Sequence, residues 1–289
     1  MNSQQIWIML KATFSSWLNN YAPSMGAALA YYTMFSIAPL LLIVISTAGL
    51  IFGEEAVRGE IFIQLRGLMG DQGAQAVQGL LESVSEPKKG TLSTIIGTIL
   101  LLIGATSVFS ELQDAFDRIW HAPPKEDKQA SWWKVLRVRL LSLGIILGIG
   151  FLMIVSLVFS AAMAALGKWW GPLFKNLEIL EVVNFVFSFI LMTVIFAMFY
   201  KFMPRVRVSW RDVWAGATVT AFLFTIGKLL IGFYIGTSAI TSGFGAAGSL
   251  VVMLVWVYYS AQIFLLGAEF TQIYSHAHGS RRDSLPHTG

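Results

Sequence analysis

One lysine interrupts a long apolar stretch of the sequence. The stretch TAFLFTIGKLLIGFYIG, residues 220–236, holds a single charged residue, Lys228. A charge near the bilayer centre costs roughly 2.5 to 3.5 kcal/mol on insertion scales, so it is usually paired, hydrated or extended toward the interface. Two interpretations stay open. Either Lys228 extends toward the outer membrane surface, or it lines an outward-facing cavity and binds an anionic group of a substrate, with Glu178 and Glu181 as candidate partners.

A carboxylate lies at the end of another apolar stretch. In LLGAEFTQIY, Glu269 could accept a proton or an ion at the inner end of a pathway. Alternatively, it could anchor its helix by pairing with an arginine such as Arg205 or Arg211. We do not expect Glu269 to pair with Lys228, because the two stretches run in opposite directions across the membrane and place the two charges at different depths.

Polar side chains gather in two further segments. In ALAYYTMFSIAPLLLIV, hydroxyl groups precede a proline that frees a backbone carbonyl, and they either line a polar cavity or satisfy that carbonyl. In SELQDAFDRIW, Glu111 and Asp114 follow an apolar stretch and either contact a cation or proton from a cytoplasmic vestibule or belong to a solvated helix end. The candidate residues for a substrate or ion pathway are Tyr31, Tyr32, Ser36, Pro39, Glu111, Asp114, Lys228 and Glu269.

The sequence favours neither a catalytic site nor a metal site. It has no cysteine, and its four histidines lie in one predicted loop and in the C-terminal tail, without a metal-ligand pattern. It has no G-x-x-x-x-G-K-[ST] run that would bind a nucleotide. We therefore expect a protein that is not an enzyme and needs no cofactor.

Composition indicates that the pathway residues belong to a membrane protein. The chain is 56% hydrophobic and 12% charged, whereas soluble domains carry about 25% charged residues. A bilayer core about 30 Å thick needs about 20 apolar residues per helix. The sequence predicts an all-α integral membrane bundle of six transmembrane helices, at residues 23–53, 90–110, 140–167, 182–200, 213–236 and 244–268.

Two amphipathic regions accompany the predicted spans. Residues 1–22 carry apolar side chains at helical spacing and predict a helix on the cytoplasmic membrane surface, before a six-span domain at residues 23–275. Residues 54–89 predict two amphipathic periplasmic helices, broken near Gly67, Gly70 and Gly73, that form either a cap or a lid. The tail at residues 276–289 is polar and is expected to be disordered.

Charge and small residues predict orientation and packing. With the N-terminus inside, 13 of the 20 Lys and Arg residues fall in cytoplasmic segments, so both termini are expected in the cytoplasm. This distribution also explains a pI near 9.3 without nucleic-acid binding, because anionic lipids attract such loops. Close helix packing is expected at two small-residue pairs, Gly144 with Gly148 and Gly232 with Gly236.

Three segments together resemble the YihY / virulence factor BrkB family of bacterial inner-membrane proteins. They are ALAYYTMFSIAPLLL, VFSELQDAFDRIW, and WRDVWAGATVTAFLF with LVVMLVWVYYSAQIFLLGAEF. The resemblance covers about residues 10–275 and implies six spans in the inner membrane with both termini cytoplasmic. Transport or export is the usual suggestion for this family, and some members are linked to lipid-like molecules. The family is also called ribonuclease BN, but short loops and the absence of a metal-ligand pattern argue against a nuclease.

These observations predict a transporter or flippase-like exporter of an anionic or amphiphilic substrate, including lipid-like molecules. The alternative is a non-transporting membrane scaffold or envelope assembly factor. Expected partners are membrane lipids and a small-molecule or lipid-like substrate, without nucleic acid. A homodimer is one option, because six spans are few for a self-contained transporter.

Overall fold

The computed structural model describes residues 3–85, 107–123, 177–237 and 248–281. Residues 107–119 are helical. The other described elements are the helices α1 (Ser3–Asn19), α2 (Ala22–Phe52), α3 (Glu54–Ser85), α6 (Leu177–Phe202), α7 (Trp210–Thr237) and α9 (Gly248–Ala277). Within the described ranges, the all-α prediction is therefore confirmed.

Three of these helices are long and apolar enough to cross a membrane. They cover Val182–Phe202, Trp210–Ile235 and Leu250–Ala277, and they correspond to the predicted fourth, fifth and sixth spans. Helix α2 occupies nearly the range of the predicted first span and continues through Pro39. The predicted spans at 90–110 and 140–167 lie mostly or wholly outside the described residues, so the structure does not show six spans.

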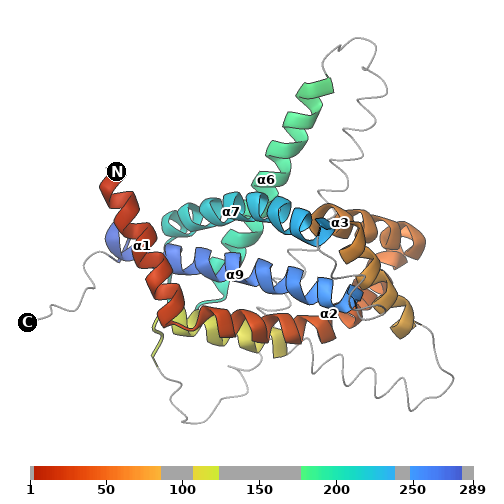
Figure 1. Cartoon of the computed structure of the whole chain (residues 1–289), viewed down its shortest axis with the longest axis horizontal. Coiled ribbons are helices and arrows are strands. Elements are labelled where there is room, and N and C mark those ends of the chain that lie inside the picture. Colours follow the sequence, from red (N-terminus) through yellow and green to blue (C-terminus); the bar gives the residue numbers. More distant parts are fainter. Residues whose placement is uncertain (1–2, 86–106, 124–176, 238–247, 282–289) are drawn as a thin grey trace, which may run out of the picture.

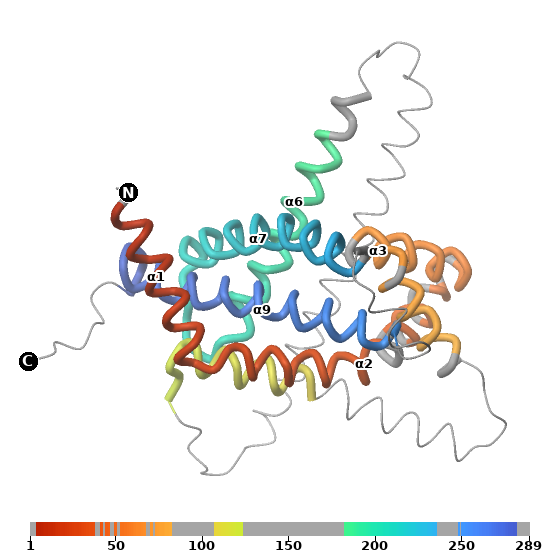
Figure 2. Tube along the Cα trace, viewed as in Figure 1, coloured from red at the N-terminus to blue at the C-terminus, as the bar shows by residue number. Residues whose placement is uncertain are grey.

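Helix α9 is the centre of the bundle. It packs against α7, α2, α1 and α3, while α6 packs against α7 and also reaches Phe264 of α9 with its aromatic side chains. Figure 1 shows α1 beside the C-terminal end of α9 and α3 at the opposite end of the bundle, and the trace in Figure 2 follows the same path. We refer to these two regions as the α1 end and the α3 end.

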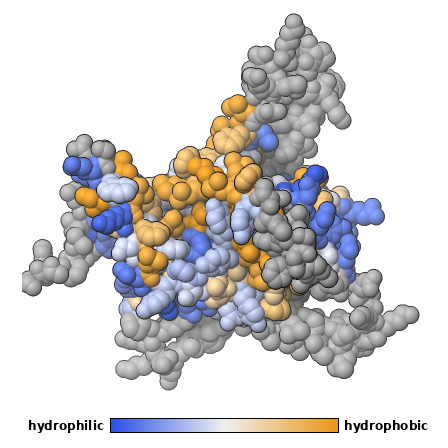
Figure 3. All heavy atoms as spheres, viewed as in Figure 1, coloured by the Kyte–Doolittle hydropathy of each residue, from blue (hydrophilic) through white to orange (hydrophobic). Residues whose placement is uncertain are grey.

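The surface has an apolar middle and more polar ends. Figure 3 shows hydrophobic side chains over α7 and the described part of α6, hydrophilic side chains at α3, and side chains of both kinds at α1. Exposed apolar residues of this band include Val182, Phe185, Phe222, Leu229 and Phe233. An exposed apolar band of this kind is expected where lipid, rather than water, surrounds the helices.

Small residues bring α7 and α9 close together in an antiparallel register. A Cβ atom placed on Gly216 would lie 2.7 Å from the Cβ of Thr271. A Cβ on Gly267 would lie 2.5 Å from the Tyr200 hydroxyl oxygen and closer still to Thr220. The expected close neighbour of this span is therefore α9, met at Gly216 and Gly227, whereas a Cβ on Gly232 would meet no atom within 4 Å in the described structure. The other predicted pair, at residues 144 and 148, lies outside the described ranges.

Helix α1 is amphipathic, as the sequence predicts. Its inner face carries the buried side chains of Met9 and Thr13 and packs against α9. Its outer face exposes the large apolar side chains of Ile6, Trp7, Leu10, Phe14 and Leu18. The outer face is available to a membrane surface, while the inner face positions polar groups against α9.

Helix α3 consists of two helical limbs, which confirms the predicted break in the segment 54–89. The break lies at Gly70, whose φ of 76° and ψ of 177° are not helical. A positive φ is accessible to glycine without the steric cost that a side chain brings. Both limbs pack apolar side chains against α2, and the second limb also reaches α9.

The C-terminal segment stays structured past the boundary at residue 276 where disorder was predicted to begin. Helix α9 continues to Ala277, and residues 278–281 form turns. Ser280 donates two hydrogen bonds to Asp212 Oδ2, one from its backbone N at 3.1 Å and one from Oγ at 2.6 Å. This contact holds the segment against the start of α7, so the predicted boundary is several residues too early.

Candidate functional site: a buried carboxylate between α1 and α9

Glu269 is a fully buried carboxylate at the α1 end. Its Oε2 accepts a hydrogen bond of 2.7 Å from Ser16 Oγ, and its Oε1 accepts one of 2.7 Å from Asn20 Nδ2. Asn20 Nδ2 also lies 3.3 Å from Ser16 Oγ, as a weaker donor to that hydroxyl. Both oxygens of the carboxylate are therefore satisfied by donors from α1.

Local sequence explains why α1 presents these two donors. Ser16 and Asn20 are four residues apart, so they lie one above the other on a helix face, on the side that also buries Met9 and Thr13. Tyr21 follows with a left-handed φ of 59°, and the next helix, α2, has a proline in its first turn. This sharp corner between α1 and α2 holds the amide of Asn20 over Glu269.

The partners of Glu269 are neutral groups, not the arginines that the sequence suggested. Arg205 instead pairs with Asp117, with 2.8 Å between Nη2 and Oδ2, and Arg211 is exposed. His121 forms no hydrogen bond with the carboxylate in the described structure. The sequence signal for these partners is weak: Ser16 and Asn20 stand four residues apart, among several other polar residues of the same segment.

A second buried polar group joins three helices near Glu269. The hydroxyl oxygen of Tyr200, from α6, lies 2.9 Å from Thr220 Oγ1 of α7 and donates to the carbonyl oxygen of Phe264 of α9 at 2.8 Å. The Tyr200 side chain is fully buried. Buried hydroxyl groups normally need such partners, because a lost hydrogen bond inside the protein is costly. Sequence analysis did not select Tyr200, because residues 182–200 carry no charged side chain to draw attention to a polar contact.

Lys228 lies on α7, away from Glu269. It is half-buried and makes no hydrogen bond or ion pair with any side chain of the described ranges. Its neighbour Gly227 packs against Tyr259 of α9, which stands ten residues before Glu269, or about 15 Å along the helix. The prediction that the two charges do not pair is thus confirmed, while the side chains of Glu178 and Glu181 lie outside the described part of the chain.

The other predicted pathway residues are dispersed. Tyr31 is exposed on α2 and its ring contacts Tyr32 and Phe35 edge to face. Ser36 is buried and donates to the carbonyl oxygen of Thr33 at 3.3 Å, so its hydroxyl satisfies its own helix.

The carboxylates of the 107–119 helix are also apart from Glu269. Glu111 is half-buried and Asp114 exposed. Neither these two residues nor the hydroxyl cluster of α2 forms a described contact with Glu269 or Lys228.

Comparison with known proteins places the chain among bacterial membrane proteins. It is 28% identical over 276 residues to a UPF0761 membrane protein of Pseudomonas aeruginosa (strain LESB58), covering 92% of this chain and 62% of that protein. It is 27% identical over 256 residues to a UPF0761 membrane protein of Tolumonas auensis, covering 86% and 79% of the two chains. The chain thus spans less than two thirds of the length of the Pseudomonas relative. No solved structure matches it. The family model described as Virulence factor BrkB matches residues 13–289, so the chain belongs to the virulence factor BrkB family.

Proposed function

We propose that this chain is a transporter or flippase-like exporter of an anionic or amphiphilic substrate in the bacterial inner membrane. Its partners would be the surrounding lipids and the substrate, and the proposal assigns it no enzymatic reaction, cofactor or nucleic acid. Membership of the BrkB family and the three membrane-length apolar helices support the location in a membrane. The proposed activity depends on the ionisable groups inside the bundle.

The burial of Glu269 among neutral donors is the observation that carries the proposal. An ionisable residue inside a membrane bundle is costly and marks a functional site by default. A carboxylate that only anchors a helix is best neutralised by a cation, but Arg205 pairs with Asp117 instead. With hydroxyl and amide partners, Glu269 can gain or release a proton without leaving an unpaired cation behind. This property suits an ion-coupled step in transport.

Lys228 provides a charge of opposite sign at another depth. Its half-buried ammonium group has no described partner, and a lysine binds phosphate or carboxylate groups as a point charge. It lies about 15 Å from the level of Glu269, by the rise of an α-helix. A substrate with an anionic group could therefore be attracted at Lys228, while Glu269 responds to protons at the α1 end.

The distribution of basic residues supports the orientation. Within the described ranges, the α1 end carries Lys11, Arg118, Lys201, Arg205, Arg207, Arg211 and Arg281. Only Arg58 and Arg66 stand at the α3 end of the described structure. Positive residues are retained on the cytoplasmic side during insertion. The proposal therefore places Glu269 near the cytoplasm and α3 at the periplasmic face.

Reconstitution tests the proposed activity directly. The purified full chain is inserted into vesicles that hold a fluorescent phosphatidylglycerol, and a membrane-impermeant quencher reports how fast the lipid changes leaflet, with and without a pH gradient. We expect faster movement than in empty vesicles, and loss of the gradient response in Glu269→Gln. Glu55→Gln, which removes an exposed carboxylate from the start of α3, is the matched control and should behave as the wild type. Movement no faster than in empty vesicles under either condition would overturn the proposal and favour a non-transporting scaffold.

A further inference from the structure

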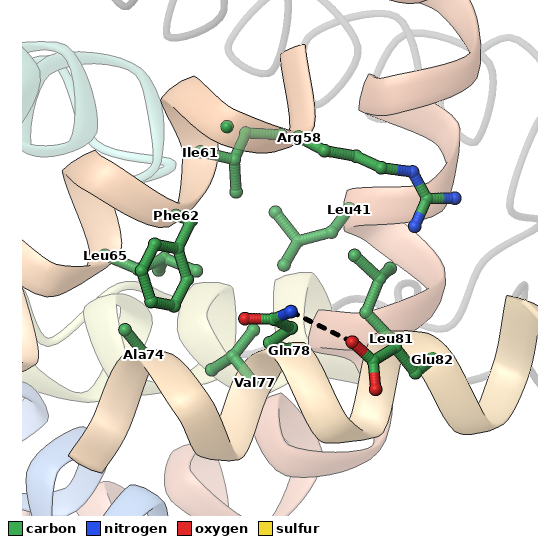
Figure 4. Close-up of a pocket in the computed structure, with 11 residues that line it drawn as sticks. Leu41, Arg58, Ile61, Phe62, Leu65, Ala74, Val77, Gln78, Leu81 and Glu82 are labelled. Atoms are coloured by element: carbon green, nitrogen blue, oxygen red, sulfur yellow. Dashed lines mark hydrogen bonds between the residues drawn. The ribbon is translucent and has the colours of Figure 1, made fainter. Parts of the chain in front are cut away.

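A cavity of about 290 Å³ lies between the two limbs of α3 and the adjoining helix α2. Figure 4 shows the first limb above it, the second limb below, and Leu41 of α2 between them. Most of its walls are apolar side chains, among them Ile61, Phe62, Val77 and Leu81. Ligand pockets in proteins commonly measure about 300 to 1,000 Å³, so this cavity is at the small end of the range.

The bend at Gly70 determines which residues of the two limbs face each other. Arg58 and Glu82 each stand twelve residues from Gly70, on opposite limbs, so both lie about 18 Å from the bend along their helices. Phe62 and Ala74 are nearer the bend. In Figure 4, the guanidinium of Arg58 and the carboxylate of Glu82 lie at one end of the cavity, away from Phe62 and Ala74. The cavity therefore has an apolar inner end and a charged rim.

The rim presents one group of each sign. Glu82 accepts a hydrogen bond of 2.9 Å from Gln78 Nε2, which leaves its second oxygen directed away from that amide. Arg58 is half-buried, and across the described ranges it forms no ion pair or hydrogen bond. On the same limb, by contrast, Arg66 is neutralised by Asp71. A guanidinium without a partner beside apolar walls favours a phosphate or carboxylate, which it can bind in a bidentate manner.

We propose that this cavity binds a single-chain zwitterionic amphiphile with a phosphoethanolamine-type headgroup. The acyl chain occupies the apolar interior between Phe62, Val77 and Leu81, because these side chains surround it with apolar atoms. The phosphate pairs with Arg58 and the ammonium group with Glu82. A fatty acid would satisfy Arg58 but would place its carboxylate near that of Glu82. The small volume, about 290 Å³, favours one acyl chain over two.

The inference names a class of amphiphile as the substrate of the proposed transporter. It rests on the proposed function only in calling the bound molecule a substrate. Binding itself can be measured without transport. If the cavity is labelled but no lipid moves in the vesicles, the proposed function is contradicted and the binding inference stands. If lipid moves but the cavity is not labelled, the binding inference is contradicted and the proposed function stands.

The test uses the full chain in phosphatidylglycerol vesicles with a lysophosphatidylethanolamine that carries a photoactivatable diazirine in its chain. After illumination, mass spectrometry locates the labelled peptides. We expect labels on the two limbs of α3, and displacement by unlabelled lysophosphatidylethanolamine at concentrations about tenfold lower than by a fatty acid of equal length. Arg58→Ala should reduce labelling about tenfold, as expected for loss of a charge-assisted contact. Arg66→Ala, on the same limb but outside the cavity, should label as the wild type.

The Glu82→Gln variant separates zwitterionic recognition from simple attraction to a cation. Because Glu82 is exposed at the rim, this substitution leaves the packed interior unchanged. We expect the fatty acid to compete as well as the lysophospholipid in Glu82→Gln but not in the wild type. Equal labelling of Arg58→Ala and Arg66→Ala would overturn the inference. So would equal competition by the fatty acid in the wild type, or labels spread over the exposed apolar face of α6.

Discussion

Asn20 Nδ2 donates a hydrogen bond of 2.7 Å to Glu269 Oε1, across a separation of 249 residues in the sequence. The contact joins the residue that directly follows α1 to a buried carboxylate near the end of the last described helix. Ser16 donates to the other carboxylate oxygen from one turn earlier. Helix α1 therefore does more than lie on the membrane surface, because its inner face provides the described hydrogen bonds that stabilise the charge of Glu269.

Removal of the Asn20 amide tests how far Glu269 depends on α1. In Asn20→Ala, the carboxylate loses one of its two described donors, and hydrogen bonds to charged groups contribute about 1.5 to 3 kcal/mol. We expect the free energy of unfolding in detergent, followed by circular dichroism, to fall by about this amount. The adjacent Asn19 is exposed, so Asn19→Ala is the matched control. Equal stability of the two variants would contradict a structural role for the contact.

The close approach of α7 and α9 predicts opposite effects for two glycine substitutions. A methyl group at Gly267 would lie 2.5 Å from the Tyr200 hydroxyl oxygen, and overpacking of this kind costs about 1 to 3 kcal/mol. Gly267→Ala should therefore lower the thermal unfolding temperature. A methyl group at Gly232 meets open space, and Gly232→Ala should leave stability unchanged or raise it by up to about 1 kcal/mol through helix propensity. A destabilised Gly232→Ala would favour the small-residue pattern that sequence analysis selected.

The Tyr200 hydroxyl is expected to stabilise the junction of α6, α7 and α9. Tyr200→Phe keeps the ring and removes the contacts with Thr220 and the Phe264 carbonyl. We expect a loss of about 0.5 to 1.5 kcal/mol in the free energy of unfolding. Tyr258 is partly exposed, and Tyr258→Phe should cost less. Denaturation of both variants in the same detergent provides the comparison, and a larger cost at position 258 would contradict the assignment.

Sequence reasoning predicted the features that depend on local periodicity. The helical segments, the break in α3 near Gly70 and the separation of Lys228 from Glu269 all follow from the spacing of apolar residues and the rise of a helix. The partners of Glu269 could not be predicted in this way, because Ser16 and Asn20 lie 253 and 249 residues away. An arginine is a common partner of a buried carboxylate, but Arg205 forms its ion pair with Asp117 and not with Glu269.

A spacing pattern in the sequence also could not show which glycines lie at the interface between α7 and α9. Gly232 belongs to a G-x-x-x-G spacing but faces away from α9, whereas Gly267 and Gly216 meet threonines across the interface. A spacing motif marks one face of a helix, and the helix's rotation within the bundle decides whether that face meets a neighbour. The cavity of α3 likewise depends on how two limbs fold back on each other, which the sequence does not specify beyond the bend.

Accessibility of single cysteines tests most directly whether a polar path leads to the buried charges. The native chain has no cysteine, so Lys228→Cys and Glu269→Cys can be probed in intact and permeabilised cells with a membrane-impermeant thiol reagent. Leu229→Cys is the matched control, because Leu229 is 68% exposed on the apolar surface beside Lys228 and should be shielded by lipid. The proposed transporter predicts reaction at 228 from outside the cell, reaction at 269 only after permeabilisation, and none at 229. Inert cysteines at both 228 and 269, with reactive controls in the loops, would contradict a polar path and make Lys228 and Glu269 structural charges of a scaffold.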